Sequence, residues 1–205
     1  MLTDKTLRDL LMAFAAPDPT PGGGSASAVA SAIGVSLLTM VAGLPRTRTG
    51  SDEDRAALTG AATALTAVQQ QLTEAIDLDT TAYDQVVAAY KLPKGGDAEQ
   101  TSRTAAIQRA LRSATDVPLG VMRLSGMALK QAETVAAHGH RAASSDVGVA
   151  VALLGAGFRG ARLNVEINLG SLNDQAYVEA VKSELERLET ATGGSIAALA
   201  SSNRY

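Results

Sequence analysis

The fold class follows from the segment Pro19–Gly43, which reads PTPGGGSASAVASAIGVSLLTMVAG. Its two prolines and three consecutive glycines predict neither a helix nor a regular strand before Ser25. The small, apolar run that follows predicts a helix, and no charged residue occurs between Asp18 and Arg46. A helix that is apolar on every side is typically buried, so we expect it at the centre of the molecule, with other helices around it.

The run Ser25–Gly43 would also suit a helix that spans a membrane. Alanine, serine and glycine dominate it, its ends lack aromatic anchors, and the chain contains no second segment of this kind. These features favour a buried core helix, and we expect no membrane partner.

The composition of the whole chain favours helices. Of its 205 residues, 39 are alanine, the strongest helix former, and only six are aromatic. The absence of cysteine excludes disulfides, thiolate-ligated metal sites and a thiolate nucleophile. The length suits one domain that covers residues 1–205.

Charge and the N-terminal sequence bear on partners and compartment. The net charge is -3 and the basic residues form no strong stripe, so we expect no nucleic-acid partner. Residues 1–5 lack the basic and apolar regions of a secretory signal, so we expect the protein to be cytoplasmic.

Apolar periodicity and helix-breaking residues predict six to seven helices and no strand. The helices are expected over residues 3–14, 25–43, 51–90, 98–114, 118–137, 144–168 and 174–192. The segment Thr115–Pro118 reads as a cap followed by a first-turn proline, or as a kink. We therefore predict an all-α, single-domain, antiparallel helical bundle, with a tail that frays from Gly193.

Asp79 is a charged residue on an apolar helix seam. The seam of the expected helix 51–90 runs in steps of three or four through Leu58, Ala61, Leu65, Val68, Leu72, Ala75, Tyr83, Val86 and Tyr90. A buried carboxylate without a partner is costly. Three explanations are therefore open: Asp79 pairs with an arginine, it lies where the seam opens to water, or it is a functional acid.

Two asparagines lie on a second seam, which runs through Ala150, Leu154, Gly157, Ala161, Asn164 and Asn168. The two amides either fix the packing of the helix or contact an amide or carboxylate of a ligand. Asp146 stands where a helix N-cap is expected, and Lys94 lies in a loop bounded by proline and glycine.

The glycines Gly22–Gly24 present successive backbone N–H groups at a helix N-terminus, which is in principle an anion site. Alternatively, they permit tight packing where a buried helix begins. The segment is neither a P-loop nor a dinucleotide fingerprint, because it lacks the lysine of the first and the preceding strand of the second. His138 and His140 have no third ligand nearby in the sequence, so we expect no metal site.

Taken together, these motifs resemble the formiminotetrahydrofolate cyclodeaminase and methenyltetrahydrofolate cyclohydrolase family. The matching segments are, in order, Pro19–Ser25, Met40–Ala42, Asp79, Ala82–Tyr83, Leu92–Lys94, Ala114–Leu119, Ser145–Asp146 and Asn164–Asn168, and they span nearly the whole chain. The resemblance implies an all-helical fold, a homodimer, cytoplasmic one-carbon metabolism, and a folate site in a groove between helices near the glycines.

The resemblance also implies roles for individual residues. The expected catalytic acid–base groups are Asp79, Lys94 and Asp146. The expected substrate contacts are Pro21, Gly22, Gly23, Gly24, Ser25, Arg48, Asn164 and Asn168. Arg48 lies in the loop Pro45–Gly50, where relatives carry a basic cluster that could hold the glutamate tail of folate.

Both reactions of this family pass through a tetrahedral carbon between two folate nitrogens, and both need a base and an acid. Neither needs a metal, so we expect no cofactor beyond the tetrahydrofolate-linked substrate. We further expect the small residues of 25–43 and 147–161 to let two helices approach closely and form one wall of the ligand groove. The altered arginine loop keeps open a different class of function, a non-catalytic helical module that binds a folate or a partner protein.

Overall fold

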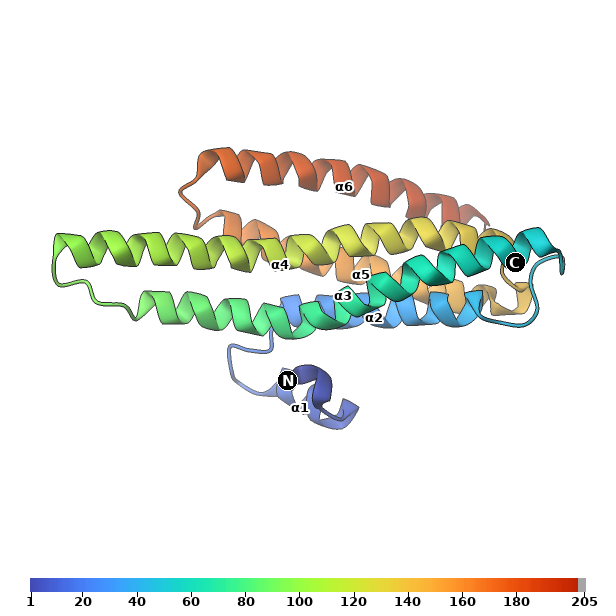
Figure 1. The fold of residues 1–205 in the computed structure, drawn as a ribbon, viewed down its shortest axis with the longest axis horizontal. Helices are drawn as coiled ribbons and strands as arrows, with labels where there is room; N and C mark the ends of the chain where they lie inside the picture. The colour runs from blue at the N-terminus through green and yellow to red at the C-terminus, as the bar shows by residue number, and fades with distance from the viewer. Residues whose placement is uncertain (203–205) are drawn as a thin grey trace.

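Five long helices and one short one make up the computed structural model, which describes residues 1–202 (Figure 1). The helices are α1 (Leu7–Ala15), α2 (Gly23–Ala42), α3 (Asp52–Tyr90), α4 (Asp97–His138), α5 (Ser144–Leu169) and α6 (Gln175–Ser202), with short 3₁₀ turns η1 (Leu2–Asp4) and η2 (Arg141–Ala143). Within residues 1–202, one isolated bridge is the only β-type pairing. The predicted all-α fold is confirmed.

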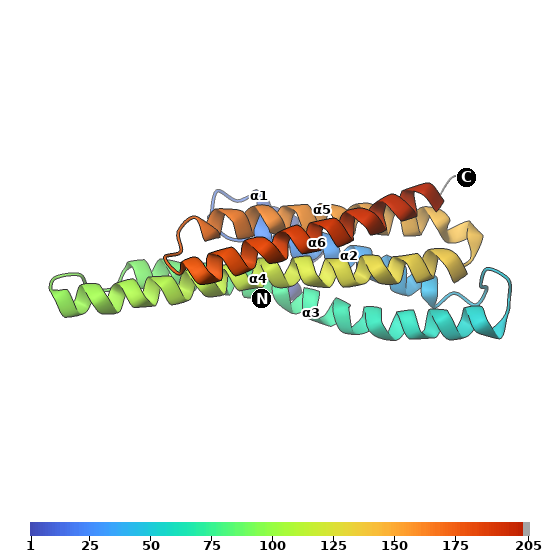
Figure 2. The same cartoon turned by 90° about the horizontal axis from the view of Figure 1, so that it is seen from above.

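Helix α4 lies at the middle of the molecule. It packs against α3, α5 and α6, and α2 lies beside both α3 and α5. Seen from above, α4 separates α3 from the α5–α6 pair (Figure 2). Helices α3 and α4 form an antiparallel hairpin whose tip runs beyond the other helices (Figure 1).

The seam of α3 is buried at the predicted positions from Leu58 to Ala75, and after that the buried positions shift. Leu58, Leu65 and Leu72 are fully buried, and Ser51 caps the helix by accepting a hydrogen bond from the backbone N–H of Asp54 at 3.1 Å. Beyond Ala75 the predicted seam positions Tyr83 and Tyr90 are 40% and 50% exposed, and the neighbouring residues Ala82 and Ala89 are buried in their place. Asp79 lies at this transition.

Helix α4 corrects the prediction of a break at Thr115–Pro118. The helix continues from Asp97 to His138 with Pro118 buried inside it. Proline has no N–H, so the carbonyl of Ala114, four residues earlier, loses its usual partner. The side chain of Asn168 on α5 donates to that carbonyl at 2.8 Å and replaces the missing bond.

The C-terminal helix also extends further than predicted. Helix α6 passes through Gly193 and Gly194 and continues to Ser202, so the expected helix end at Thr192 is wrong. Ile196 and Leu199 pack against the core, and this contact offsets the low helix propensity of the two glycines. The final residues of the expected frayed tail, 203–205, lie outside the described part of the chain.

Helices α2 and α5 pack unusually close together, as their small residues predict. A Cβ atom at Gly157 would overlap the hydroxyl of Ser31, and one at Gly160 would overlap that of Ser27. On α2, a Cβ at Gly34 would lie 2.9 Å from the carbonyl oxygen of Ala150. Only glycine permits this spacing at all three positions.

Helix α2 is not surrounded on all sides, which corrects the expectation of a fully enclosed central helix. It is the one described helix long and apolar enough to cross a membrane by length and composition, and half of that apolar stretch is buried. Its buried side faces α3, α4 and α5, whereas Ile33 and Met40 are 48% and 43% exposed.

Candidate active site

Asp79 lies on α3 against the N-terminus of α2. Its Oδ2 atom accepts hydrogen bonds from the backbone N–H of Ser25 at 2.8 Å and from the Ser25 hydroxyl at 3.0 Å. Ser25 is fully buried, and its hydroxyl also lies 2.9 Å from the carbonyl oxygen of Ile76. The structure therefore resolves the question raised by the seam, because Asp79 caps a helix N-terminus rather than pairing with an arginine.

The environment of Asp79 suits a carboxyl group that changes its protonation state. Burial raises the pKa of Asp79, and the two hydrogen bonds from Ser25 only partly oppose this effect. The Ser25 hydroxyl has a single proton, which can go to Asp79 or to the carbonyl of Ile76. A neutral Asp79 could then donate to the Ser25 oxygen, so both protonation states of the carboxyl find partners.

The glycines at the start of α2 make this contact possible. A Cβ atom at Gly24 would overlap the carboxylate of Asp79, and one at Gly23 would lie 3.3 Å from the Asn164 side-chain nitrogen. Gly22 is the N-cap residue, and the peptide bond between Thr20 and Pro21 is cis. The N–H groups of the first helical turn have no partner within the helix, which leaves them suited to an oxygen or anion.

Asn164 and Asn168 lie on α5 at different distances from Asp79. Asn164 lies beside Gly23, and its amide nitrogen donates to the carbonyl of Gly160 at 2.9 Å. Asn168 is one turn further along, where it supports the proline in α4. Asn164 thus lies at the edge of the Asp79 site, whereas Asn168 has a defined structural role.

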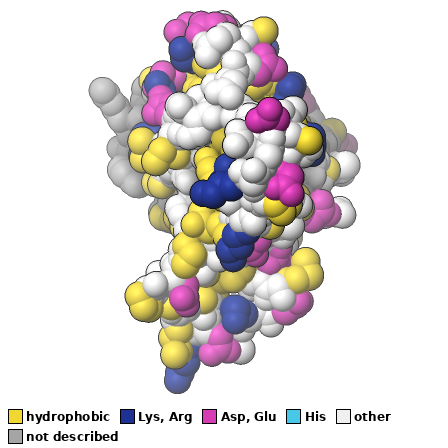
Figure 3. Space-filling view, turned by 90° about the vertical axis from the view of Figure 1, so that its left-hand side faces the viewer, with side chains coloured by type: hydrophobic (Ala, Val, Ile, Leu, Met, Phe, Trp, Pro, Cys, Tyr) yellow, Lys and Arg dark blue, Asp and Glu magenta, His cyan; other side chains and the backbone are white. Residues whose placement is uncertain are grey.

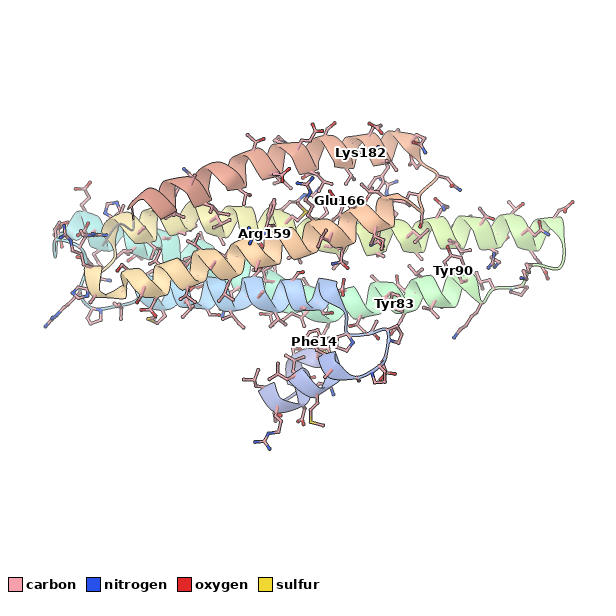
Figure 4. The ribbon with its side chains drawn as sticks, turned by 180° about the vertical axis from the view of Figure 1, so that it is seen from behind. Phe14, Tyr83, Tyr90, Arg159, Glu166 and Lys182 are labelled. Atoms are coloured by element: carbon pink, nitrogen blue, oxygen red, sulfur yellow. The ribbon has the colours of Figure 1, made fainter. Side chains whose placement is uncertain are left out.

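The other predicted acid–base groups lie far from Asp79 within one chain. Lys94 is exposed in the loop between α3 and α4. Tyr83 and Tyr90 lie along α3 on the way to this loop (Figure 4). About 16 Å of helix separates Asp79 from Tyr90, where α3 ends. Asp146 lies in the first turn of α5, about 27 Å of helix before Asn164. The single chain therefore unites Gly23, Gly24, Ser25, Asp79 and Asn164 but not Lys94 or Asp146.

Arg48 lies at the opposite end of α2 from Asp79, about 26 Å away along the helix. Its backbone N–H donates to the carbonyl of His138 at 2.7 Å, and its guanidinium donates to the carbonyl of Ala136. These bonds join the loop after α2 to the end of α4.

Around Arg48, in the loop that the resemblance predicts to contact the substrate, is a cavity of about 540 Å³. We call it the arginine pocket; its charged and titratable lining residues are Arg46, Arg48, Asp52, Arg55, His140 and Arg141. The pocket holds four arginines and one aspartate. The guanidinium groups of Arg48 and Arg55 donate to backbone carbonyls, so Arg46 and Arg141 are the cations best suited to a carboxylate or phosphate group. Two of the four arginines lie in the loop and the others on α3 and η2, so no local sequence motif reveals the cluster.

A buried aspartate holds the arginine pocket in shape. Asp54 accepts bonds from the side chain of Thr47 at 3.2 Å and from the backbone and hydroxyl of Thr49, both at 2.7 Å, and it lies 2.8 Å from Nδ1 of His138. The His138 contact, followed by the Thr49 bonds, holds the pKa of Asp54 well below its usual range. His138 thus contacts Asp54 through Nδ1. The described residues contain no cluster of three metal-ligating side chains.

The fold and the site define an all-helical protein with a protonatable carboxyl at a glycine-rich helix N-terminus. The family model described as formiminotransferase-cyclodeaminase matches residues 6–187, and the chain belongs to this family.

Individual relatives agree with this assignment. The chain is 39% identical to the methenyltetrahydrofolate cyclohydrolase of Methylorubrum extorquens, over 94% of this chain and 93% of the relative. It is 32% identical to the formimidoyltransferase-cyclodeaminase of Rattus norvegicus, over 91% of this chain but only 35% of that longer protein. The crystal structure of formiminotetrahydrofolate cyclodeaminase from Thermotoga maritima superposes with a TM-score of 0.88 at 26% identity, covering 98% and 97% of the two chains.

Proposed function

We propose that this chain is a folate-dependent one-carbon enzyme that acts as a methenyltetrahydrofolate cyclohydrolase. The observation that carries the proposal is the half-buried carboxyl of Asp79, which has a raised pKa and lies against the glycine-rich start of α2. The relative from Methylorubrum extorquens, which is similar over nearly the full length of both chains, supports hydrolysis as the first candidate reaction.

Asp79 would carry the proton in both halves of the hydrolysis. As the oxygen of water bonds to the methenyl carbon, the carboxylate of Asp79 takes one proton from the water. The carbon–nitrogen bond then breaks, the new hydroxyl loses its proton to solvent and becomes a carbonyl, and Asp79 returns its proton to the leaving nitrogen. Acid–base catalysis of this kind typically contributes about 10²–10⁴-fold to the rate.

The start of α2 would bind the substrate beside this carboxyl. The N–H groups of Gly23 and Gly24 point out of the first helical turn, and the amide of Asn164 lies next to Gly23. The proposed contacts are therefore Pro21–Ser25 and Asn164, with proton transfer and hydrogen bonds as the chemistry. These steps require only proton transfer, so we propose no cofactor beyond the folate-linked substrate.

Lys94, Asp146 and Arg48 could contribute only in a larger assembly. Within one chain these three residues lie too far from Asp79 to reach the carbon that reacts there. Their proposed roles therefore depend on a second copy of the chain. We propose a homodimer as the active form, in the cytoplasm, without a nucleic-acid or membrane partner.

Ammonia release from formiminotetrahydrofolate is the second candidate reaction. It is favoured by the structural match to the Thermotoga maritima cyclodeaminase and would use the same carboxyl, with a folate nitrogen attacking the formimino carbon. Incubation with each folate, followed by chromatography of the folates and an ammonia assay, separates the two. We expect a formyl product from methenyltetrahydrofolate; ammonia from the formimino substrate alone would assign the second reaction, and folate binding without either product would support the non-catalytic alternative.

A further inference from the structure

Tyr83 differs from the other aromatic residues in the described part of the chain. Phe158 is buried in the core, Phe14 is half-buried, and the rings of Tyr90 and Tyr177 each lie against the guanidinium group of an arginine. Tyr83 is 40% exposed, and among residues 1–202 neither its ring nor its hydroxyl has a ring contact or a hydrogen-bond partner. Its ring face is therefore open to a flat group from outside the chain.

The packing of α3 leaves this ring on the surface. The seam of α3 predicts a buried position at Tyr83, but the hairpin of α3 and α4 buries Ala82 and Ala89 instead. The small alanine side chains face the neighbouring helix, and the large ring beside them stays outside. The view onto the tip of the hairpin shows hydrophobic side chains exposed between the hairpin and the projecting N-terminal segment (Figure 3).

Tyr83 and Asp79 lie on the same face of α3. They are four residues apart, which brings their Cβ atoms to about 5–6 Å from each other. Side chains on a helix lean toward its N-terminus, so the ring of Tyr83 leans toward the turn that carries Asp79. Tyr83 lies on α3 just beyond the start of α2 (Figure 4). A flat group stacked on this ring would therefore have its nearest substituent beside the carboxyl of Asp79.

Polar groups at the start of α2 lie on the other side of Asp79. The N–H groups of Gly23 and Gly24 have no partner within the helix, because they belong to its first turn. Asn164 lies beside Gly23, and its amide oxygen is an available acceptor, since its nitrogen already donates to Gly160. The site thus offers a ring face, hydrogen-bonding groups and a protonatable carboxyl close together.

A flat heterocycle with a polar edge fits this combination. The pterin of a tetrahydrofolate has a flat pyrimidine ring with amino and carbonyl groups along its edge, and one of its nitrogens is bonded to the carbon that reacts. The aminobenzoyl ring, on the other side of that carbon, has no such edge beside its flat face. The groups around Tyr83 therefore match the pterin better than the second ring of the substrate.

We propose that Tyr83 binds the pterin of the folate by ring stacking, with the reacting carbon at Asp79. The choice of ligand rests on the proposed function, whereas the exposed ring beside a buried carboxyl is a feature of the fold. The stack is the same in the bound substrate and in the transition state, so Tyr83 contributes to binding and takes no part in proton transfer.

Three variants test the role of the ring. We expect Tyr83→Leu to raise KM for the converted folate about 5–50-fold with kcat nearly unchanged, because stacking on an aromatic side chain contributes an affinity of this order. Tyr83→Phe keeps the ring and should retain the wild-type KM. Tyr90→Leu is the matched control, since Tyr90 is an exposed ring on the same helix, about 16 Å from Asp79, and should also retain it.

The same kinetics can overturn the proposal. A wild-type KM in Tyr83→Leu would show that the ring binds nothing, and a KM in Tyr83→Phe as high as in Tyr83→Leu would assign the effect to the hydroxyl. Circular dichroism checks the fold of each variant. An unfolded Tyr83→Leu would assign the residue to the stability of α3 and would overturn the proposal as well.

Binding of the two halves of the folate tests the choice of ring without turnover. Calorimetry with 6-methyltetrahydropterin and with p-aminobenzoylglutamate compares the wild type and Tyr83→Leu. We expect the variant to bind the pterin more weakly by the factor seen in KM and to bind the other half unchanged. A loss confined to p-aminobenzoylglutamate, or equal or absent pterin binding by the two proteins, would overturn the proposal. A wild type that binds the pterin but converts neither folate would refute the proposed function alone, and the two affinities would still decide the role of Tyr83.

Discussion

Asp79 makes a structural contact, but its buried environment disfavours the charged form of its carboxyl group. Its carboxylate caps α2 through Ser25, yet burial raises its pKa above the ordinary value of 3.8. The folded state therefore binds the proton of Asp79 more tightly than the unfolded chain does. The stabilisation that results is complete below pH 3.8 and is lost as the pH rises through the raised pKa.

The direction of this pH dependence gives a prediction for the stability of Asp79→Asn. Asparagine is neutral at every pH and can still accept the bond from Ser25, so the variant should be at least as stable as the wild type at pH 7. The stability difference should disappear near pH 3. Urea unfolding followed by circular dichroism across this range measures it, and a variant that loses more than about 1 kcal/mol at pH 7 would show that the charge mainly caps the helix.

Gly24 tests how closely α2 must approach Asp79. In Gly24→Ala the new methyl group would overlap the carboxylate, so we expect a loss of about 1–3 kcal/mol in unfolding free energy together with reduced turnover. Gly60→Ala is the matched control, because Gly60 lies within α3 with open space around it, and alanine there should stabilise by about 0.5–1 kcal/mol. Equal effects of the two changes would contradict the close contact.

At the scale of helices, α4 shows how a tertiary contact overrides a local signal. Pro118 predicts a break, but Asn168 supplies the missing hydrogen bond from a helix 50 residues further along the chain. Because this partner is remote in sequence, no reading of residues 115–118 alone could have found it. The three-four spacing needs no such partner, and it correctly predicted the buried seam of α3 over Leu58, Ala61, Leu65, Val68 and Leu72.

The coupling of Asn168 to Pro118 can be measured directly. Asn168→Leu should cost about 1–3 kcal/mol, because it leaves the Ala114 carbonyl unsatisfied inside the bundle. In a Pro118→Ala background the helix regains its own N–H, so the same change should cost clearly less. A double-mutant cycle by urea unfolding gives the interaction energy, and strictly additive costs would rule out the proposed compensation.

At the scale of the whole molecule, the elongated bundle separates candidate site residues that follow one another as motifs along the sequence. The motifs identified the family and located Asp79, Asn164 and the glycines, which the fold brings together. They could not show that Lys94 and Asp146 lie at opposite ends of the bundle, because order along a chain carries no distance. They placed Arg48 in a loop that could hold the folate tail, but they could not show that Arg55 and Arg141 lie beside it, since the members of the pocket come from three separate segments.

Proton transfer by Asp79 in a folate reaction is tested by measuring the turnover of methenyltetrahydrofolate and formiminotetrahydrofolate with three proteins. These are the wild type, Asp79→Asn, and Asp84→Asn, which changes an exposed carboxylate on the same helix. We expect that the wild type converts one of the two folates, that Asp84→Asn matches it, and that Asp79→Asn turns over about 10²–10⁴-fold more slowly while remaining folded. A folded Asp79→Asn that turns over at the wild-type rate would contradict proton transfer by Asp79.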